Sequence, residues 1–334
     1  MNFRYIFMLL ASVLILGACQ TGGGSSAGKS SKKTADINKI KTPVFNADSA
    51  YSYVDKQVAF GPRVPNTKPH EKCADYLAGE LKRFGADVIV QEANVTAYNG
   101  KTLNAKNIIG QFNPEKNNRV LLFAHWDSRP FADHDPDPAK RNTPILGAND
   151  GASGVGVLLE IARQINKAGI NIGVDIIFFD AEDYGTPEHL DLQYKPDTWC
   201  LGTQYWCKHP HKEGYTARWG ILLDMVGGPN AVFYKELYSK QFAPDLLDKV
   251  WNTAADLGYL SFFSFEDGGQ IIDDHVYVSK LMHIPSIDII QHEPMSETNF
   301  NEFWHTHKDN MDNIDKATLK AVGQTVLHVI YSEH

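Results

Sequence analysis

Three short and almost unbroken apolar runs constrain the fold of this chain more than any other feature. They occupy residues 120–124, 174–179 and 219–226. Runs of this length without polar alternation are typical of strands buried on both faces of a helix-covered sheet. Residues 151–168, between the first two runs, carry apolar side chains on one face at helical spacing. Strand, helix and strand in this order form the crossover unit of a parallel sheet.

The remaining periodicity extends this unit into one α/β domain. Further helices are predicted at residues 48–58, 67–84, 243–257, 274–281 and 316–330. Further strands are predicted at residues 87–96, 104–112 and 285–290. Asp315 is placed to cap the last helix. No internal repeat or long linker follows residue 40, so we expect residues 40–334 to form a single domain. Its core is a twisted, mostly parallel central β-sheet flanked by helices.

The first residues indicate export rather than folding. Arg4 precedes a twelve-residue apolar run at 5–16, and Leu16-Gly17-Ala18-Cys19 follows. Such a run is too short to span a bilayer of about 30 Å as a helix, but it suits the apolar part of a signal peptide. The small residues before Cys19 resemble a bacterial lipobox, which implies cleavage before Cys19 and lipidation of its thiol. The alternatives are an ordinary secretory signal and a buried helix.

This interpretation divides the chain into three parts. We expect a lipoprotein signal peptide at 1–18, a flexible tether at 19–39 that is rich in Gly, Ser and Lys, and the folded domain at 40–334. The protein is then a bacterial cell-envelope lipoprotein. Neutral residues follow Cys19, which favours an anchor that faces the periplasm. Whether the anchor lies in the inner or the outer membrane stays open.

Composition and cysteine count exclude several classes of protein. With 43% hydrophobic residues and a formal charge of −8, the chain is globular and lacks the basic character of a nucleic-acid binder. Four cysteines are too few for a disulfide scaffold of this size. Once Cys19 is lipidated, Cys200 and Cys207 either form a disulfide or remain free thiols. We expect Cys73 to be buried on a helix.

Polar side chains gather where the predicted strands end. Because ligands of open α/β sheets bind outside the carboxyl ends of the strands, we expect these side chains at one edge of the sheet. The set comprises His125, Asp127, Asp150, Glu182, Asp183 and Asp224, with Asp273, Trp304 and His305 later in the chain. Crowded carboxylates repel one another unless a cation is bound, and oxygen and imidazole ligands suit catalytic zinc. Asp127 is placed to orient the His125 ring.

The order of these residues resembles the zinc aminopeptidase superfamily, whose fold we therefore expect. The motifs are His125-x-Asp127, Gly147-x-x-Asp150, Glu182-Asp183, Asp224 and His305. The resemblance implies that Glu182 is the general base. In the two-zinc aminopeptidases, it implies one zinc on His125, Asp150 and Asp224. It implies the other zinc on Asp150, Asp183 and His305.

Other details resemble one branch of that superfamily, the glutaminyl cyclases of animals and some bacteria. They are Trp304-His305-Thr306, Asp273-Asp274-His275 and the run from Leu222 to Gly227. The branch converts the N-terminal glutamine of peptides and proteins to pyroglutamate and releases ammonia. The resemblance implies one zinc on Asp150, Asp183 and His305, Glu182 as proton carrier, Asp273 paired with Asp224, and Trp304 in the substrate pocket. Animal members have Glu where this chain has Asp183, so its zinc would sit slightly differently.

Two other functions remain as alternatives. A two-zinc aminopeptidase that hydrolyses N-terminal residues would use all five ligand positions, and all five are present. A non-catalytic binding module would have lost some of them. The partners expected for the cyclase are peptide N-termini that bear Gln, and a membrane reached through the lipid anchor. Nucleic acid is not expected, and the oligomeric state is not indicated.

An acidic loop at 131–138 contains Asp133, His134, Asp135 and Asp137. It lacks the spacing of an EF-hand calcium loop. We expect a solvated acidic loop near the entrance of the site.

Overall fold

The structure is a computed structural model that describes residues 40–333 except 191, 194 and 196. The predicted signal peptide, the tether and Cys19 lie outside the described residues. Within the described part of the chain, no helix is both long and apolar enough to cross a membrane.

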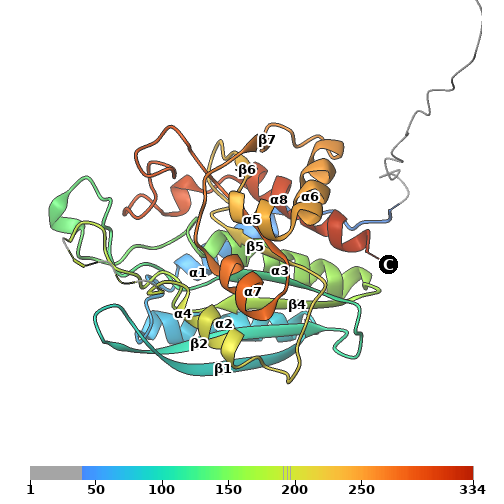
Figure 1. Cartoon of the computed structure of the whole chain (residues 1–334), viewed down its shortest axis with the longest axis horizontal. Helices are drawn as coiled ribbons and strands as arrows, with labels where there is room; N and C mark the ends of the chain where they lie inside the picture. The colour runs from blue at the N-terminus through green and yellow to red at the C-terminus, as the bar shows by residue number, and fades with distance from the viewer. Residues whose placement is uncertain (1–39, 191, 194, 196, 334) are drawn as a thin grey trace, which may run out of the picture. The chain divides into compact units, whose positions relative to one another are not determined.

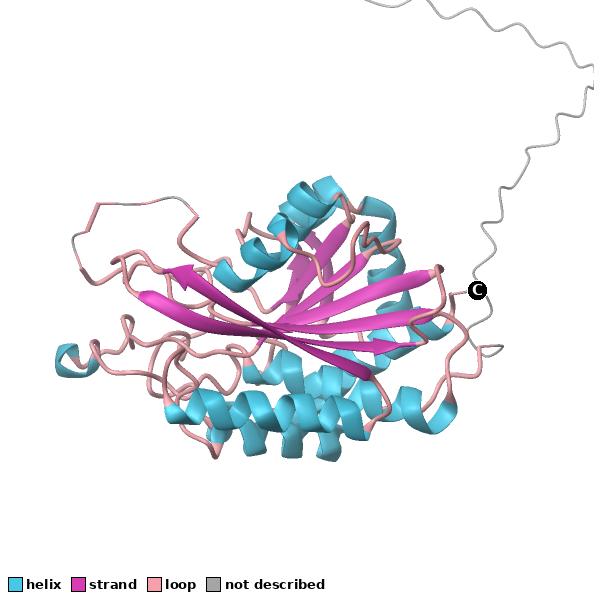
Figure 2. Ribbon diagram, turned by 90° about the horizontal axis from the view of Figure 1, so that it is seen from below, coloured by secondary structure: helices cyan, strands magenta, loops and turns pink. Residues whose placement is uncertain are grey.

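A mixed sheet forms the centre of the domain (Figure 2). Its order is β1 (Asp87–Thr96), β2 (Thr102–Phe112), β4 (Gly173–Phe179), β3 (Arg119–His125), β5 (Gly220–Asp224) and β8 (Ser286–Ile290). Three pairings, β4–β3, β3–β5 and β5–β8, are parallel, and β1–β2 and β2–β4 are antiparallel. Two short strands, β6 (Phe233–Lys235) and β7 (Phe263–Asp267), form a separate parallel pair. The parallel half of the central sheet carries the predicted site.

Helices cover both faces of the sheet (Figure 1). One face packs against α1 (Ala47–Val58), α2 (Lys68–Arg83), α3 (Ala152–Ala168), α6 (Pro244–Asp256) and α8 (Lys316–Tyr331). The other face packs against α4 (Leu201–Lys208) and α7 (Asp274–Met282), while α5 (Leu237–Phe242) lies beside β8. Two short 3-10 turns occupy Pro138–Lys140 and Met311–Asn313.

The continuous apolar runs are explained by this two-sided cover. All seven residues of β3 and of β4 are buried. Within β3, Leu122 packs in the core under α3, whereas Leu121 and Phe123 pack in the core under α4 and α7. A strand with helices on both sides has no polar face, so alternation disappears. The predicted cap is also confirmed, because the Asp315 carboxylate accepts a hydrogen bond from the Ala317 N–H at the start of α8.

Close packing of α3 on the sheet positions the loop that carries Asp150. A Cβ atom added at Gly154, in the first turn of α3, would lie 2.0 Å from the Leu223 carbonyl oxygen and 3.0 Å from the Ala124 Cβ. Only glycine permits this approach. The N-terminal end of α3 therefore lies directly over the carboxyl ends of β3 and β5.

Some elements were not predicted from the sequence. They are α4, α5, β6 and β7, all short. Cys200, the residue before α4, has a left-handed backbone conformation with φ of 54°. This conformation separates the short helix from the segment before it. Cys73, Cys200 and Cys207 are free and buried, so of the two alternatives for Cys200 and Cys207 the structure has the free thiols. Cys73 lies on α2, as predicted.

Candidate active site

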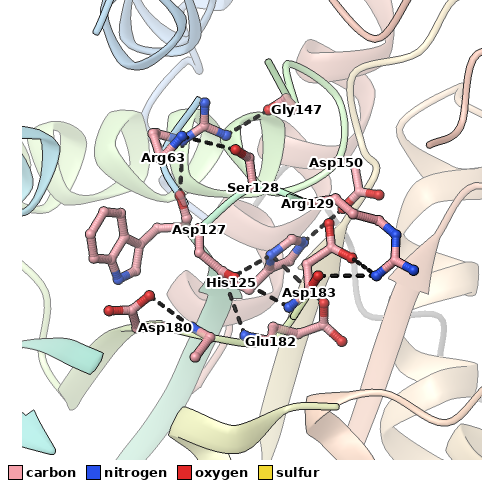
Figure 3. Close-up of polar contacts among 12 residues, drawn as sticks. Arg63, His125, Asp127, Ser128, Arg129, Gly147, Asp150, Asp180, Glu182 and Asp183 are labelled. Carbon is pink, nitrogen blue, oxygen red and sulfur yellow. Dashed lines mark hydrogen bonds and ion pairs between the residues drawn. The ribbon is translucent and has the colours of Figure 1, made fainter. Parts of the chain in front are cut away.

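The predicted site residues meet at the carboxyl edge of the parallel strands. His125 and Asp224 are the last residues of β3 and β5. Glu182 and Asp183 follow β4, and Asp150 lies in the loop before α3. Figure 3 shows His125, Asp150, Glu182 and Asp183 side by side. A cavity of about 750 Å³ opens beside them, and its lining includes Asp150, Glu182, Asp183, Asp224, Asp273, Trp304 and His305.

Among the described residues, three clusters could hold a metal ion, and two of them overlap at Asp150. The first comprises Asp150, Asp183 and His305, whose ligand atoms all lie within 4.8 Å of one another. His305 Nε2 lies 3.4 Å from Asp150 Oδ2 and 3.4 Å from Asp183 Oδ1. The buried Asp183 Oδ2 has no hydrogen-bond partner. Carboxylate and imidazole donors with one orphaned oxygen fit a zinc ion.

The second cluster comprises His125, Asp150 and Asp224. His125 Nε2 lies 3.0 Å from Asp150 Oδ1 and 3.2 Å from Asp224 Oδ1. Burial lowers the pKa of His125, but contacts with Asp127, Asp150 and Asp224 outweigh it and raise this pKa well above its usual value. The donor set of this cluster also fits zinc, and Asp150 belongs to both clusters.

The ligand loops are fixed by two further aspartates. Asp127 accepts hydrogen bonds from the Glu182 and Asp183 N–H groups, at 3.0 Å and 3.2 Å. Its Oδ1 also lies 3.5 Å from His125 Nδ1, a ring nitrogen that has no hydrogen-bond partner. The Asp309 carboxylate accepts hydrogen bonds from the main-chain N–H groups of residues 149 and 150, at 2.7 Å and 3.1 Å. Hydrogen bonds to the main chain thus hold the ligand-bearing turns in place.

The acidic loop agrees with its prediction only in part. Residues 136–138 are exposed, but Asp133 and Asp135 are only 3% and 4% exposed. The reason is a partner that sequence reasoning missed: the buried Arg129 binds the Asp133 carboxylate through two nitrogens. Asp135 accepts hydrogen bonds from the main-chain and ring N–H groups of His307. The only sequence signal was the four-residue spacing between Arg129 and Asp133.

Three residues at the same edge have strained backbone conformations. Ala181, Met225 and His305 all have left-handed backbone conformations, with φ of 53°, 47° and 52°. Such conformations cost on the order of 1–3 kcal/mol each for residues other than glycine, and they persist only where the surroundings impose them. Each lies at a candidate site residue or directly beside one. The surrounding fold therefore dictates how these side chains are presented.

Burial and crowding shift several of the acidic groups toward their neutral forms. Burial, and then the charges of Asp273 and Asp183, raise the pKa of Glu182 well above its usual value, although His125 opposes this. Burial, followed by Asp224 and then Asp274, likewise raises the pKa of Asp273. Burial and then Asp150 raise the pKa of Asp183 to about 6. A site of this kind can accept, hold and return a proton.

Aromatic groups complete the cavity wall, and a buried thiol contacts Glu182. The Trp304 ring lies 3.7 Å from the His305 ring and 4.6 Å from the Phe300 ring, centroid to centroid. The Cys200 thiol donates to Glu182 Oε1 at 3.3 Å, a contact that no sequence motif indicated. The cavity therefore combines an apolar side with an acidic, ligand-bearing side.

The sequence profile of peptidase family M28 matches residues 107–330, which include all of the candidate ligands. The chain belongs to peptidase family M28.

Solved structures and a curated relative agree with this membership. A Zn-dependent exopeptidase from Parabacteroides distasonis is 64% identical, with a TM-score of 0.86, over 87% of this chain and 99% of its own. The glutaminyl cyclase of Tannerella forsythia is 61% identical, with a TM-score of 0.86, over 87% of this chain and 100% of its own. The glutaminyl-peptide cyclotransferase of Bos taurus is 23% identical over 304 residues, which cover 81% of this chain and 78% of that protein. The fold of this M28 chain is accordingly that of zinc exopeptidases and glutaminyl cyclases.

Proposed function

We propose that this protein is a glutaminyl-peptide cyclotransferase, an enzyme that converts N-terminal glutamine to pyroglutamate and releases ammonia. One observation carries the proposal: Glu182, Asp273 and Asp224 line the same cavity as the Asp150–Asp183–His305 cluster and Trp304. The likeness to a bacterial glutaminyl cyclase at 61% identity and to an animal glutaminyl-peptide cyclotransferase supports it. The substrates are peptides and proteins whose first residue is Gln.

The chain's own residues supply binding and proton transfer. Asp150, Asp183 and His305 would hold the zinc ion, which would supply Lewis-acid polarisation of the γ-carbonyl group of the substrate. Glu182 accepts a proton from the attacking α-amine and delivers it to the amide nitrogen that departs as ammonia. The bond from the α-nitrogen to the γ-carbonyl carbon forms as the bond from that carbon to the amide nitrogen breaks.

The second acidic pair and the tryptophan orient the substrate. The buried Asp273, whose pKa is raised by burial and by Asp224, is suited to hold the leaving nitrogen together with Asp224. Trp304 provides an apolar wall against which the short glutamine side chain packs.

The number of metal ions separates the proposal from its alternative. We propose one zinc, on Asp150, Asp183 and His305. A two-zinc aminopeptidase would also fill the cluster of His125, Asp150 and Asp224, which has a suitable donor set. Elemental analysis of the purified protein should give about one zinc per chain. A value near two would favour the aminopeptidase.

Product analysis tests the activity directly. A glutaminyl dipeptide should yield ammonia and the pyroglutamyl dipeptide, without free amino acid. A leucyl dipeptide, which has no γ-amide, should remain intact. Free glutamine or free leucine among the products would overturn the proposal in favour of peptide hydrolysis.

We further propose that the protein is a lipoprotein of the cell envelope that faces the periplasm. The support is the sequence alone, in the apolar run at 5–16 and the small residues before Cys19.

A further inference from the structure

We propose that Arg129 is a positioning residue for the metal site. It holds Asp183 directly and His305 through Asp133, so that both ligands are oriented for zinc before the ion binds. This inference rests on the zinc-dependent function proposed above. It concerns the affinity of the site for the metal rather than the reaction that follows.

The first arm of this arrangement runs from Arg129 to Asp183. Arg129 is fully buried in the loop after β3. Its Nη1 donates to the Asp183 main-chain oxygen at 3.1 Å and to Asp183 Oδ1 at 3.2 Å. One nitrogen thus holds the backbone and the side chain of the same ligand. The contact leaves Asp183 Oδ2 buried without a protein partner, as a free position for a metal ion.

The second arm runs through Asp133 to His305. The guanidinium grips the Asp133 carboxylate, with Nε 2.8 Å from Oδ1 and Nη2 2.6 Å from Oδ2. Asp133 Oδ1 in turn lies 3.4 Å from His305 Nδ1. A carboxylate on this side of the ring favours the tautomer that presents Nε2 as a ligand. His305 Nε2 is the atom that faces Asp150 and Asp183.

A contact with an aromatic ring restricts the orientation of the Arg129 guanidinium. The Arg129 Cζ lies 4.5 Å from the centre of the Trp199 ring. Trp199 is also nearly parallel to the His305 ring, with an interplanar angle of 5° and centroids 6.2 Å apart. Lysine has no planar fork, so it cannot bind Asp133 with two nitrogens and contact Asp183 in the same geometry. Figure 3 shows Arg129 pointing toward Asp183.

The chain offers a matched control at the other end of β3. Arg119, the first residue of that strand, is also buried and also grips an aspartate with two nitrogens. Its Nε lies 2.6 Å from Asp175 Oδ2, and its Nη2 lies 2.7 Å from Asp175 Oδ1. Replacing this pair disturbs a buried ion pair of the same kind at the opposite end of the strand from the ligands. It therefore measures what the loss of such a pair does to the fold alone.

The experiment measures zinc affinity rather than turnover. Zinc is removed from the purified full-length protein, and its dissociation constant is determined by competition with a chromogenic chelator. We expect Arg129→Lys and Asp133→Asn each to weaken zinc binding roughly 10–100-fold. The double variant should lose less than the product of the two effects, because both changes break one connected unit. Arg119→Lys and Asp175→Asn should lower Tm while the zinc dissociation constant stays within about threefold of wild type.

Two results would overturn the inference. One is a folded Arg129→Lys protein that binds zinc as tightly as wild type, and the other is an equal loss of affinity in the Arg119 and Asp175 variants. If Arg129→Lys does not fold, Asp133→Asn alone carries the test with the same outcomes. The measurement is independent of product identity. A protein that fails the dipeptide assay but shows these affinities refutes the proposed reaction and supports the role of Arg129.

Discussion

Glu182 and Asp183 are neighbours in the sequence, yet their carboxyl groups have different surroundings. The Cys200 thiol donates to Glu182, whereas the Arg129 guanidinium contacts Asp183. Burial and then Asp150 raise the pKa of Asp183 to about 6, although His305 and Arg129 oppose this shift. Burial raises the pKa of Glu182 well above its usual value. Adjacent carboxyl groups in unlike environments are suited to different tasks, here a metal ligand and a proton carrier.

The role of Glu182 predicts a specific effect on turnover. Glu182→Gln preserves size but cannot shuttle a proton, so kcat should fall by about 10²–10⁴-fold while zinc stays bound. Ammonia release from a glutaminyl dipeptide and zinc analysis measure the two quantities. Glu115→Gln, at an exposed position in the loop between β2 and β3, is the control. Near-normal turnover in Glu182→Gln would show that another group carries the proton.

At the scale of the element, α3 determines the geometry of the site. Its close approach to β5 at Gly154 fixes the loop that carries Asp150 relative to the end of β5 that carries Asp224. Two side chains tie this contact further: Ser153 Oγ accepts from the Val226 N–H at 2.9 Å, and Asn149 Oδ1 accepts from the Gly227 N–H at 2.8 Å. The ligands on the helix side and on the strand side are therefore held as one unit.

Gly154→Ala tests this packing. The added methyl group would collide with the Leu223 carbonyl, so α3 must shift, at a cost of about 1–3 kcal/mol of unfolding free energy. We expect a lower Tm together with weaker zinc binding. Gly79→Ala is the matched control, because that glycine is exposed on α2 with nothing within 4 Å of an added Cβ. It should keep or raise Tm, since alanine favours a helix over glycine by roughly 0.5–1 kcal/mol. Equal Tm values for the two variants would contradict this account.

Glu236 links α5 and α7 and makes stability depend on pH. Its carboxylate accepts from the Tyr238, Ser239 and Ile271 N–H groups and bonds to His275. Burial raises its pKa, but His275 and the main-chain groups lower it to about 2, below its ordinary value of 4.5. Its contribution is therefore present above about pH 4.5 and is lost as the pH falls toward 2.

Glu236→Gln should therefore reduce stability most at neutral pH and flatten its decline below pH 5. Urea unfolding between pH 7 and pH 3 measures this, with Glu266→Gln, at an exposed position on β7, as the control. A decline in stability parallel to that of wild type would exclude Glu236 as its source.

The sequence predicts the long and buried elements well and the short ones poorly. β3 and β4 lie within one residue of their apolar runs, because two-sided burial leaves a clear pattern. By contrast, α4 follows a residue in a left-handed conformation, and β6 has only three residues, too few to show a period. His125, Asp183 and Asp224 were predicted because they lie at or just after strand ends, whereas Asp150 was predicted from the turn before a helix and His305 from the family resemblance. Asp133 was misjudged because its burial depends on a contact with the distant His305 and on a pairing with Arg129 that the four-residue spacing alone does not establish.

At the scale of the whole molecule, the cavity lies at one edge of the described domain, and the predicted signal peptide and tether lie outside the described residues. The prediction of a lipid anchor thus concerns a part of the chain separate from the site. Activity and location should be separable by mutation.

Cys19→Ser removes the thiol that a lipid would modify. When the gene is expressed in a Gram-negative host, the wild-type protein should fractionate with membranes and incorporate labelled palmitate, whereas the variant should be unlabelled. Specific activity toward a glutaminyl dipeptide should stay the same, because residue 19 precedes the folded domain. A wild-type protein without label would rule out the lipoprotein assignment.

Asp150 contributes to both metal clusters, and this has a consequence for how ions load onto the protein. Because one carboxylate is a ligand in both clusters, binding of a first zinc ion would change the affinity of the other cluster for a second ion. A zinc titration of the metal-free protein should therefore show either saturation at one equivalent or a second step coupled to the first. The ligand residues are the same whether one or two zinc ions bind, so the shape of the binding curve distinguishes the two outcomes. A one-zinc enzyme and a two-zinc enzyme can therefore have the same ligands and differ only in the free energy of binding the second ion.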